Sequence, residues 1–229
     1  MNETMNWELY TGERAGADAL LLADFAQSAH GIYGADLGCG SGVILLLLLL
    51  GSAARRMTGV DIRESAVLSC RENLRRFSLA GRGSAVCADY RSAPIAPGSL
   101  DFAAANPPYF PARRGRLSPD PARAAQRTES ASAAELCAAA ARYLKPGGEF
   151  FLVHRTEREP ELLRSLSAAG LTPVRRRSVF SAPGKPAPIF LVQAVKGAPE
   201  GAVRRESVLI RGADGRETPE YRKICHWEA

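Results

Sequence analysis

Apolar residues recur along the chain with two spacings, and these spacings predict helices and strands in alternation. Positions that repeat every three or four residues predict amphipathic helices, and the continuous apolar run from Val43 to Leu50 predicts a buried one. Shorter apolar runs bounded by glycine, proline or polar residues predict strands. The predicted helices cover residues 17–29, 43–53, 64–79, 129–144 and 157–169. The predicted strands cover residues 32–37, 57–62, 84–88, 100–105, 149–154, 171–180 and 188–196.

This alternation favours an α/β fold, in which a mostly parallel sheet carries helices on both faces. The last two predicted strands are joined by a hairpin with proline and glycine but no helix, so one of them should run antiparallel. We expect one domain over 1–229, with a helical lead-in over 1–31 and a polar tail over 197–229. Ligands of such sheets bind beyond the carboxyl ends of the strands, so the residues that follow each strand are the candidates for chemistry.

Composition and charge narrow the class of protein. Of the 229 residues, 46% are hydrophobic and 24% are charged, which is ordinary for a globular protein. No apolar run approaches the roughly 20 residues that a membrane span needs, and no secretory signal is visible. Five cysteines without a Cys-x-x-Cys pair argue against a zinc site or a disulfide framework, so we expect reduced thiols, no metal and a cytoplasmic protein. The net charge of +6 is compatible with a nucleic-acid partner.

A glycine-rich turn follows the first predicted strand, in Asp36-Leu37-Gly38-Cys39-Gly40-Ser41-Gly42. Glycines directly after a strand allow a tight turn and let a ligand approach the backbone closely. The spacing Gly-x-Gly-x-Gly differs from the Gly-x-Gly-x-x-Gly of dinucleotide-binding proteins, and the sequence lacks the Gly-Lys-Ser/Thr of a P-loop. Asp36, Gly38, Gly40 and Gly42 are therefore candidate ligand-binding residues.

Two aspartates lie at the ends of the next two predicted strands. Asp61, in Gly59-Val60-Asp61-Ile62, can accept hydrogen bonds from both ribose hydroxyls of an adenosine-containing ligand, and its alternative role is a helix N-cap. Asp89 can accept a hydrogen bond from an adenine amino group, and its alternative role is that of a turn residue beside Tyr90. We place Asp61, Ile62 and Asp89 in the same candidate ligand site.

The most specific motif is Asn106-Pro107-Pro108-Tyr109, directly after the strand predicted over 100–105. Two prolines after a strand fix an extended, rigid path. The side-chain oxygen of Asn106 and the carbonyl of Pro107 can then both accept hydrogen bonds from one amino group, which leaves the lone pair of its nitrogen free for an electrophile. Tyr109 offers a flat face on which a planar group can stack.

These three motifs, in this order and spacing, resemble those of class I S-adenosylmethionine-dependent methyltransferases that act on amino nitrogens. Within that class the chain most resembles the bacterial tRNA adenine-N6 methyltransferases that modify tRNA(Val) beside the anticodon. Ala17 stands where that family usually has threonine. Three further segments are similar to segments of this family: Gly16-Ala17-Asp18-Ala19-Leu20-Leu21-Leu22, Val192-Gln193-Ala194-Val195-Lys196-Gly197 and Thr218-Pro219-Glu220-Tyr221.

The resemblance implies a Rossmann-like sheet of seven strands, mostly parallel with one antiparallel strand, and S-adenosylmethionine as methyl donor. It implies that Asp36 and the three glycines frame the methionine part of the donor. Asp61 would then hold its ribose and Asp89 its adenine, while Asn106, Pro107, Pro108 and Tyr109 hold the acceptor. The target base must leave its stack to reach this edge of the sheet. Neither a metal nor a catalytic histidine is needed.

A basic loop follows the acceptor motif. Arg113, Arg114 and Arg116 are candidate contacts to RNA phosphates, because guanidinium groups suit phosphate recognition. The alternative is a solvated loop whose arginines reflect the arginine-rich composition of the whole chain. The run from Arg175 to Arg177 is a second, weaker candidate for the RNA surface.

Four other functions compete with tRNA adenine methylation. A glutamine-N5 methyltransferase of a release factor shares Asn-Pro-Pro-Tyr, but it normally carries a helical N-terminal substrate domain. A DNA adenine methyltransferase usually has a separate target-recognition region. A nicotinamide-dependent oxidoreductase shares Gly-x-Gly and a ribose-binding acid, but the sequence lacks a Tyr-x-x-x-Lys. A non-catalytic RNA-binding protein with this fold would not need intact glycine and acceptor motifs.

Overall fold

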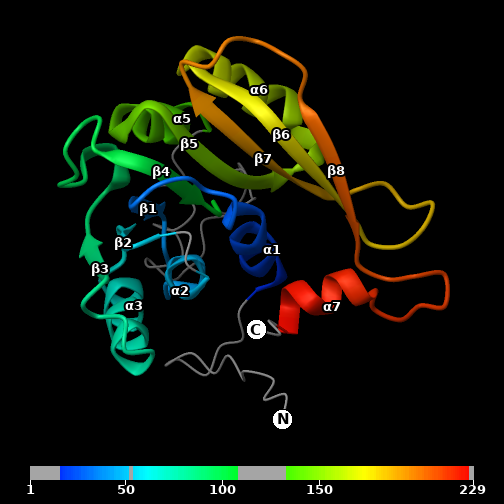
Figure 1. Cartoon of the computed structure of the whole chain (residues 1–229), viewed down its shortest axis with the longest axis horizontal. Coiled ribbons are helices and arrows are strands. Elements are labelled where there is room, and N and C mark those ends of the chain that lie inside the picture. The colour runs from blue at the N-terminus through cyan, green and yellow to red at the C-terminus, as the bar shows by residue number, and fades with distance from the viewer. Residues whose placement is uncertain (1–15, 52–53, 108–132, 227–229) are drawn as a thin grey trace, which may run out of the picture.

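The computed structural model describes residues 16–51, 54–107 and 133–226, which form one sheet with helices packed against it (Figure 1). The strands are β1 (Tyr33–Leu37), β2 (Arg56–Asp61), β3 (Gly83–Cys87), β4 (Leu100–Ala105), β5 (Leu144–Arg155), β6 (Leu171–Phe180), β7 (Ile189–Lys196) and β8 (Arg204–Leu209). The helices are α1 (Ala17–Ala26), α2 (Val43–Leu50), α3 (Glu64–Arg76), α5 (Ala133–Tyr143), α6 (Glu159–Ala168) and α7 (Pro219–His226).

The strand order across the sheet is β3-β2-β1-β4-β5-β7-β6-β8. The pairs β1–β2, β1–β4, β2–β3, β4–β5 and β6–β8 are parallel, and β7 runs antiparallel to both β5 and β6. The predicted α/β fold with one antiparallel strand in the last hairpin is therefore confirmed. The expected number of strands is corrected, because the sheet has eight strands instead of seven.

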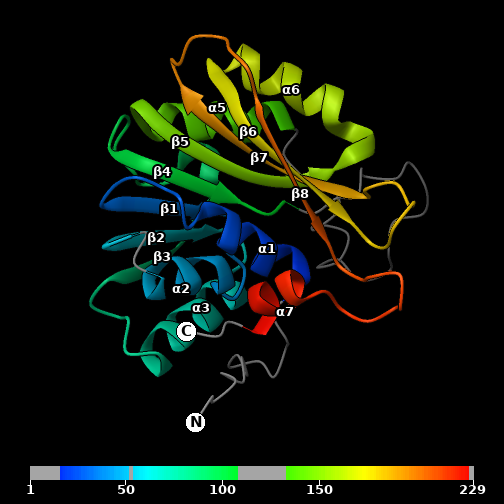
Figure 2. The same cartoon turned by 45° about the vertical axis from the view of Figure 1, so that its right-hand side comes forward.

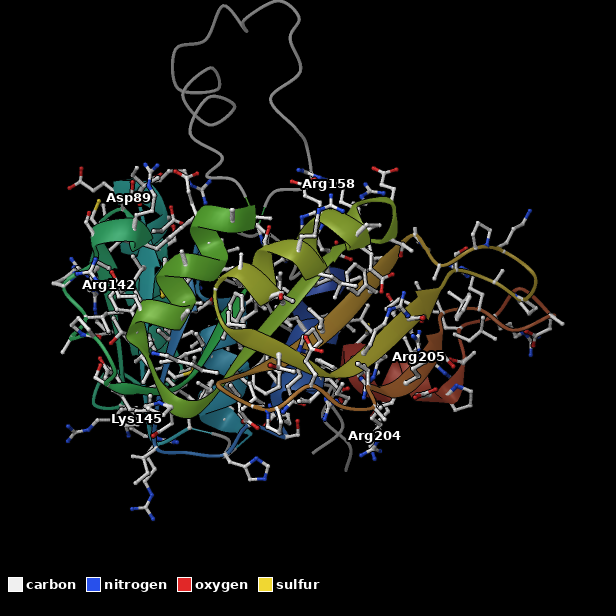
Figure 3. The ribbon with its side chains drawn as sticks, turned by 90° about the horizontal axis from the view of Figure 1, so that it is seen from above. Asp89, Arg142, Lys145, Arg158, Arg204 and Arg205 are labelled. Carbon is white, nitrogen blue, oxygen red and sulfur yellow. The ribbon has the colours of Figure 1, made fainter. Side chains whose placement is uncertain are left out.

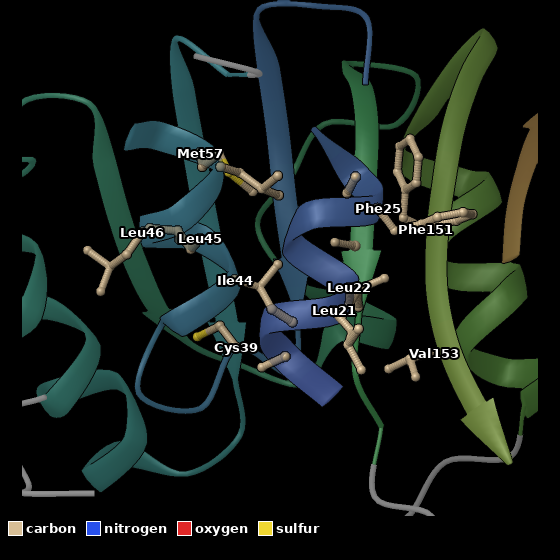
Figure 4. Packing of buried hydrophobic residues seen from close by; sticks show 14 of the residues in the cluster. Leu21, Leu22, Phe25, Cys39, Ile44, Leu45, Leu46, Met57, Phe151 and Val153 are labelled. Atoms are coloured by element: carbon tan, nitrogen blue, oxygen red, sulfur yellow. The ribbon is translucent and has the colours of Figure 1, made fainter. Parts of the chain in front are cut away.

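Helices cover both faces of the sheet, and each face has its own hydrophobic core (Figure 2). Successive side chains of a strand point to opposite faces. In β5, Phe151 and Val153 therefore pack with α1 and α2, whereas Phe150 and Leu152 pack with α5 and α6. Phe25 of α1 meets Phe151 edge to face, with 6.2 Å between ring centroids, and Figure 4 shows this contact.

The helix α2 is apolar on every side because it is enclosed on every side. Its side chains from Leu45 to Leu49 are fully buried. The helix contacts the sheet, α1 and α3, and Figure 4 shows it between these two helices. A helix without a polar face is stable only in such surroundings. It spans eight residues, and no helix in the described part of the chain is long and apolar enough to cross a membrane.

The C-terminal segment differs from the polar tail that we expected. β8 adds an edge strand beside β6, and α7 packs against α1 through the buried side chains of Tyr221 and Ile224. An edge strand can expose most of its side chains, and in β8 Val208 is fully buried while Arg204 and Arg205 are exposed (Figure 3). The polar sequence of β8 did not predict a strand, although its backbone pairs with β6 along one side.

The three arginines of β6, the weaker candidate for an RNA surface, make contacts within the fold, and their contact with RNA stays a prediction. Arg175 and Arg177 point to the face that carries α1, where their guanidinium carbons lie 3.8 and 5.1 Å from the ring centroid of Phe25. Arg176 points to the other face and donates two hydrogen bonds to Glu159. Arg177 also pairs with Asp24, and Arg175 pairs with Glu206, so each of the three arginines has an acidic partner within the protein.

Candidate active site

The candidate site residues meet at the carboxyl edge of the parallel strands. The register pairs Asp36 of β1 with Ala104 of β4, and Asn106 follows Ala104 by two residues. Asp61 is the last residue of β2, and Asp89 follows the end of β3 by two residues, at the edge seen in Figure 3. The strand order β3-β2-β1-β4 therefore brings the ends of all four strands side by side.

The three glycines of the turn have two different roles. Gly38 and Gly40 have positive φ angles of +86° and +54°, and a Cβ on Gly38 would meet nothing within 4 Å in the described structure. The bare backbone of Gly38 therefore faces open space, where a ligand can approach closely, whereas the guanidinium of Arg63 lies 4.0 Å from the Cβ position of Gly40. Gly42 also has a positive φ, of +87°, but a Cβ there would lie 2.5 Å from the Sγ of Cys70. Gly42 thus allows α3 to pack against the turn.

Hydrogen bonds from the surrounding elements hold the turn in place. The N–H of Gly38 donates to the carbonyl of Val60 (2.7 Å), which ties the turn to β2. The fully buried Asn73 of α3 donates from Nδ2 to the carbonyl of Ser41 (2.9 Å). Asn73 was not among the residues predicted for the site, although an asparagine on the apolar face of a predicted helix is a signal that it has a buried partner.

Asp36 lies beneath this turn as a buried carboxyl group. Its side chain is fully buried, and neither of its oxygens makes a hydrogen bond of regular geometry within the described residues. Burial and the nearby charge of Asp61 raise the pKa of Asp36 to about 7, and the N–H of Leu45 opposes this in part. A buried carboxyl group without a partner is costly, and such groups concentrate at functional sites.

Asp61 joins the turn to the start of α3. Its Oδ2 accepts a hydrogen bond from the N–H of Gly40 (2.9 Å), and its Oδ1 accepts one from the N–H of Arg63 (3.0 Å). The guanidinium of Arg63 donates to both oxygens, from Nε to Oδ1 (3.1 Å) and from Nη2 to Oδ2 (3.3 Å). Asp61 does not take the N-cap position of α3 that was its alternative role, because Arg63 occupies it.

Ile62 and Asp89 border the site on the side of β3. Ile62 is 48% exposed, so its apolar side chain is available for contact with a flat ligand surface. Asp89 accepts hydrogen bonds from the N–H of Arg91 (2.8 Å) and from its guanidinium, which lower the pKa of Asp89. It is the N-cap of the 3-10 turn over Tyr90–Ser92, the alternative role considered for it, and its adenine contact stays a prediction.

The acceptor motif is described in part. Asn106 and Pro107 are half-buried directly after β4, between the turn of β1 and the end of β5. Pro108 and Tyr109 lie outside the described residues, as do Arg113, Arg114 and Arg116. The geometry therefore places the first half of the motif at the same edge as the glycine turn.

The described edge suits a ligand with several chemical parts. Open glycine backbone, an unpartnered buried carboxyl at Asp36, a carboxylate at Asp61 and an exposed apolar side chain at Ile62 follow one another along it. An adenosine joined to a polar chain offers hydroxyls to a carboxylate, a flat base to an apolar side chain and polar groups to backbone. The residues present fit such a ligand.

Known proteins with similar sequences are methyltransferases. A family model described as the methyltransferase small domain matches residues 13–169. The tRNA1(Val) (adenine(37)-N6)-methyltransferase of Aeromonas hydrophila is 30% identical over 210 residues, which cover 91% of this chain and 86% of that protein. The release factor glutamine methyltransferase of Caulobacter vibrioides is 32% identical over 148 residues, which cover 61% of this chain and 51% of that protein.

A solved structure shares the fold. The crystal structure of a predicted O-methyltransferase from Agrobacterium tumefaciens superposes with a TM-score of 0.71 at 18% identity, covering 93% of this chain and 97% of that one. The family model spans well over half of the chain, and the tRNA1(Val) methyltransferase of Aeromonas hydrophila matches nearly all of it. The chain therefore belongs to the methyltransferase small domain family and is an S-adenosylmethionine-dependent methyltransferase.

Proposed function

We propose that this enzyme methylates the exocyclic N6 nitrogen of an adenine in tRNA. The observation that carries the proposal is the position of Asn106 and Pro107, next to the glycine turn at the carboxyl edge. The names of the curated relatives that match most of the chain support a tRNA adenine as the acceptor. The release factor enzyme is the second candidate, and the chain spans about half of its length.

The donor would bind along the glycine turn. Gly38 and Gly40 would accommodate its methionine part above Asp36, Asp61 would accept hydrogen bonds from its ribose, and Ile62 would contact its adenine. When bound, S-adenosylmethionine supplies a methyl group on a positively charged sulfur. Asp89 would take part only if its carboxylate can serve a ligand and Arg91 together, because Arg91 already bonds both of its oxygens.

The acceptor would bind on the side of β4. The side-chain oxygen of Asn106 and the carbonyl of Pro107 are hydrogen-bond acceptors, so together they suit an amino group with two N–H bonds. Holding both hydrogens orients the nitrogen and keeps its lone pair available. Positioning of this kind can supply a large part of a rate enhancement. Pro108 and Tyr109 complete the motif in the sequence, and Tyr109 would stack on the flipped base.

A direct assay decides between the two acceptors. Purified enzyme, S-adenosylmethionine and either a tRNA(Val) transcript or a release factor are incubated, and the products are digested and analysed by mass spectrometry. We expect N6-methyladenosine in the tRNA and no methylglutamine in the release factor. Methylation of the release factor alone would replace the proposal by the second candidate. A tRNA transcript with guanine at position 37, the position in the names of the relatives, is the matched control.

We further propose that Arg113, Arg114 and Arg116 contact RNA phosphates. Replacing all three with alanine should flatten the plot of log affinity against log salt concentration by roughly two, because each phosphate contact releases counterions. The variant should lose affinity for tRNA and for unrelated RNA alike, since phosphate contacts carry no sequence information.

The control for this prediction removes three exposed arginines from the opposite, amino edge of the sheet. Arg55, Arg56 and Arg75 lie there, and their replacement with alanine lowers the net charge by the same amount. Filter binding at four or more salt concentrations measures both slopes. Equal slopes for the two triple variants would mean that the loop acts only through the net charge of the enzyme.

A further inference from the structure

The carboxylate of Asp61 has no hydrogen-bonding capacity left for a ribose. An ionised carboxylate offers about four lone-pair positions. Four donors already surround Asp61: the N–H of Gly40 at 2.9 Å, the N–H of Arg63 at 3.0 Å, and Nε and Nη2 of Arg63 at 3.1 and 3.3 Å. Two ribose hydroxyls can therefore donate to this carboxylate only if existing donors leave.

The four donors differ in how readily they can leave. The N–H groups of Gly40 and Arg63 belong to the backbone of the turn and of the start of α3, so they can leave only if that backbone moves. The guanidinium of Arg63 is held by a flexible stem, and this side chain is 48% exposed. It covers the outer side of the carboxylate, and its Nη2 would lie 4.0 Å from a Cβ on Gly40, so it also overlies the glycine turn.

We propose that Arg63 competes with the ribose of the methyl donor for Asp61. In the structure the guanidinium occupies the positions that the ribose hydroxyls need, and donor binding displaces it into solvent. The inference rests on the proposed function of Asp61 in holding the ribose. Its consequence is that Arg63 weakens the binding of every ligand with a ribose at this site, the donor and the demethylated product alike.

The amount by which Arg63 weakens ligand binding depends on how exposed the ion pair between Arg63 and Asp61 is. Ion pairs with one partner half in solvent contribute little, up to about 1 kcal/mol, which corresponds to about fivefold in affinity. We expect Arg63→Met, which keeps a stem of similar length without charge or donors, to bind S-adenosylhomocysteine roughly twofold to fivefold more tightly. Arg63→Gln keeps a shorter, neutral hydrogen-bond donor. Its affinity for S-adenosylhomocysteine should therefore lie between those of Arg63→Met and the wild type.

The experiment measures binding by calorimetry and needs no turnover. The ligands are S-adenosylhomocysteine, adenosine and 2′,3′-dideoxyadenosine, and the last of these lacks the competing hydroxyls. The gain in Arg63→Met should be present for the first two ligands and absent for the third. The control variant is Arg75→Met, which removes an arginine from the last turn of α3 whose side chain is 66% exposed and pairs with Glu72. It should match the wild type for all three ligands.

Four outcomes separate the inference from the function on which it rests. Unchanged or weaker binding in both Arg63 variants overturns the competition. An equal gain for dideoxyadenosine also overturns it, because the effect would not depend on the hydroxyls. An Asp61→Asn variant with normal affinity for S-adenosylhomocysteine would instead remove the ribose assignment itself. Weaker binding in Asp61→Asn together with unchanged binding in Arg63→Met leaves the assignment intact and rejects only the competition.

Discussion

Asn106→Ala is expected to reduce methyl transfer by roughly a thousandfold, which is typical for the loss of one preorganised hydrogen-bonding group in an active site. The alanine variant cannot hold the amino group of the acceptor, so its nitrogen is no longer oriented toward the methyl group. Donor affinity should change little, because Asn106 follows β4 whereas the donor residues belong to β1 and β2. Single-turnover transfer to tRNA and calorimetry with S-adenosylhomocysteine measure the two quantities.

Asn106→Asp is the matched variant. Aspartate keeps an acceptor oxygen at nearly the same position and loses the amide donor, so it should retain more activity than alanine if the side chain acts as an acceptor. Activity in the alanine variant close to that of the wild type would contradict the assignment of the acceptor site. Equal losses in both variants, with donor affinity lost as well, would instead show a structural role for the amide.

The spacing of apolar residues predicted most of the helices and strands, because this spacing follows from which side chains of each element are buried. The helix predicted over 64–79 is α3, over Glu64–Arg76, and the difference lies at its end. Ser78 has a φ of 57°, in the left-handed region, and this stops the helix before the apolar pattern does. Strand ends at Leu37, Asp61 and Ala105 were predicted within one residue, since the apolar run of each strand gives way there to polar or glycine residues.

The elements that the sequence did not predict depend on partners far away in the chain. β8 reads as a polar segment because only one side of an edge strand needs to be buried. The arginines of β6 read as a basic patch because their partners, Asp24, Glu159 and Glu206, lie 17 or more residues away. A sequence shows the charges but not whether each faces another charge or water.

Some features of the candidate site could likewise be predicted from the sequence, and others could not. The glycine turn, Asp61 and Asn106 could be located from the sequence because residues that follow parallel strands share one edge. The contact of Arg63 with Asp61 and the hydrogen bond from Asn73 could not, since both arise from the way α3 packs beside the turn. The sequence also could not show that the carboxyl group of Asp36 lacks a regular hydrogen bond, because this depends on the positions of donors from other elements of the fold.

Asp36→Asn is expected to stabilise the ligand-free protein, and to do so more at pH 8 than at pH 5. The folded protein raises the pKa of Asp36 from 3.8 to about 7, so ionisation of this group opposes folding. The sign follows from linkage: for a carboxyl whose pKa is raised, stability is full below the unfolded pKa and is lost as the pH rises through the folded pKa. Above about pH 7 the loss is constant.

The expected magnitude is large for one substitution. Each pH unit between the two pKa values changes the free energy of unfolding by about 1.4 kcal/mol, so the advantage of the variant should grow by about 2–3 kcal/mol from pH 5 to pH 8. For a protein of this size that corresponds to roughly 5–10 °C in melting temperature. Thermal unfolding at both pH values measures it, and Asp214→Asn, at an exposed loop aspartate, should show no such change with pH.

The same variant links stability to function. A buried carboxyl group without a partner is retained at a cost to stability, and such costs are expected where a binding site needs the charge. Asp36→Asn should therefore bind S-adenosylhomocysteine more weakly at pH 8 while it melts at a higher temperature. The difference in melting temperature between Asp36→Asn and the wild type could instead be the same at pH 5 and pH 8. In that case Asp36 does not titrate in this range, and a partner for its carboxylate must exist. If stability rises and ligand affinity is unchanged, the carboxyl group does not contribute to the donor site, and the glycine turn alone must hold the methionine part.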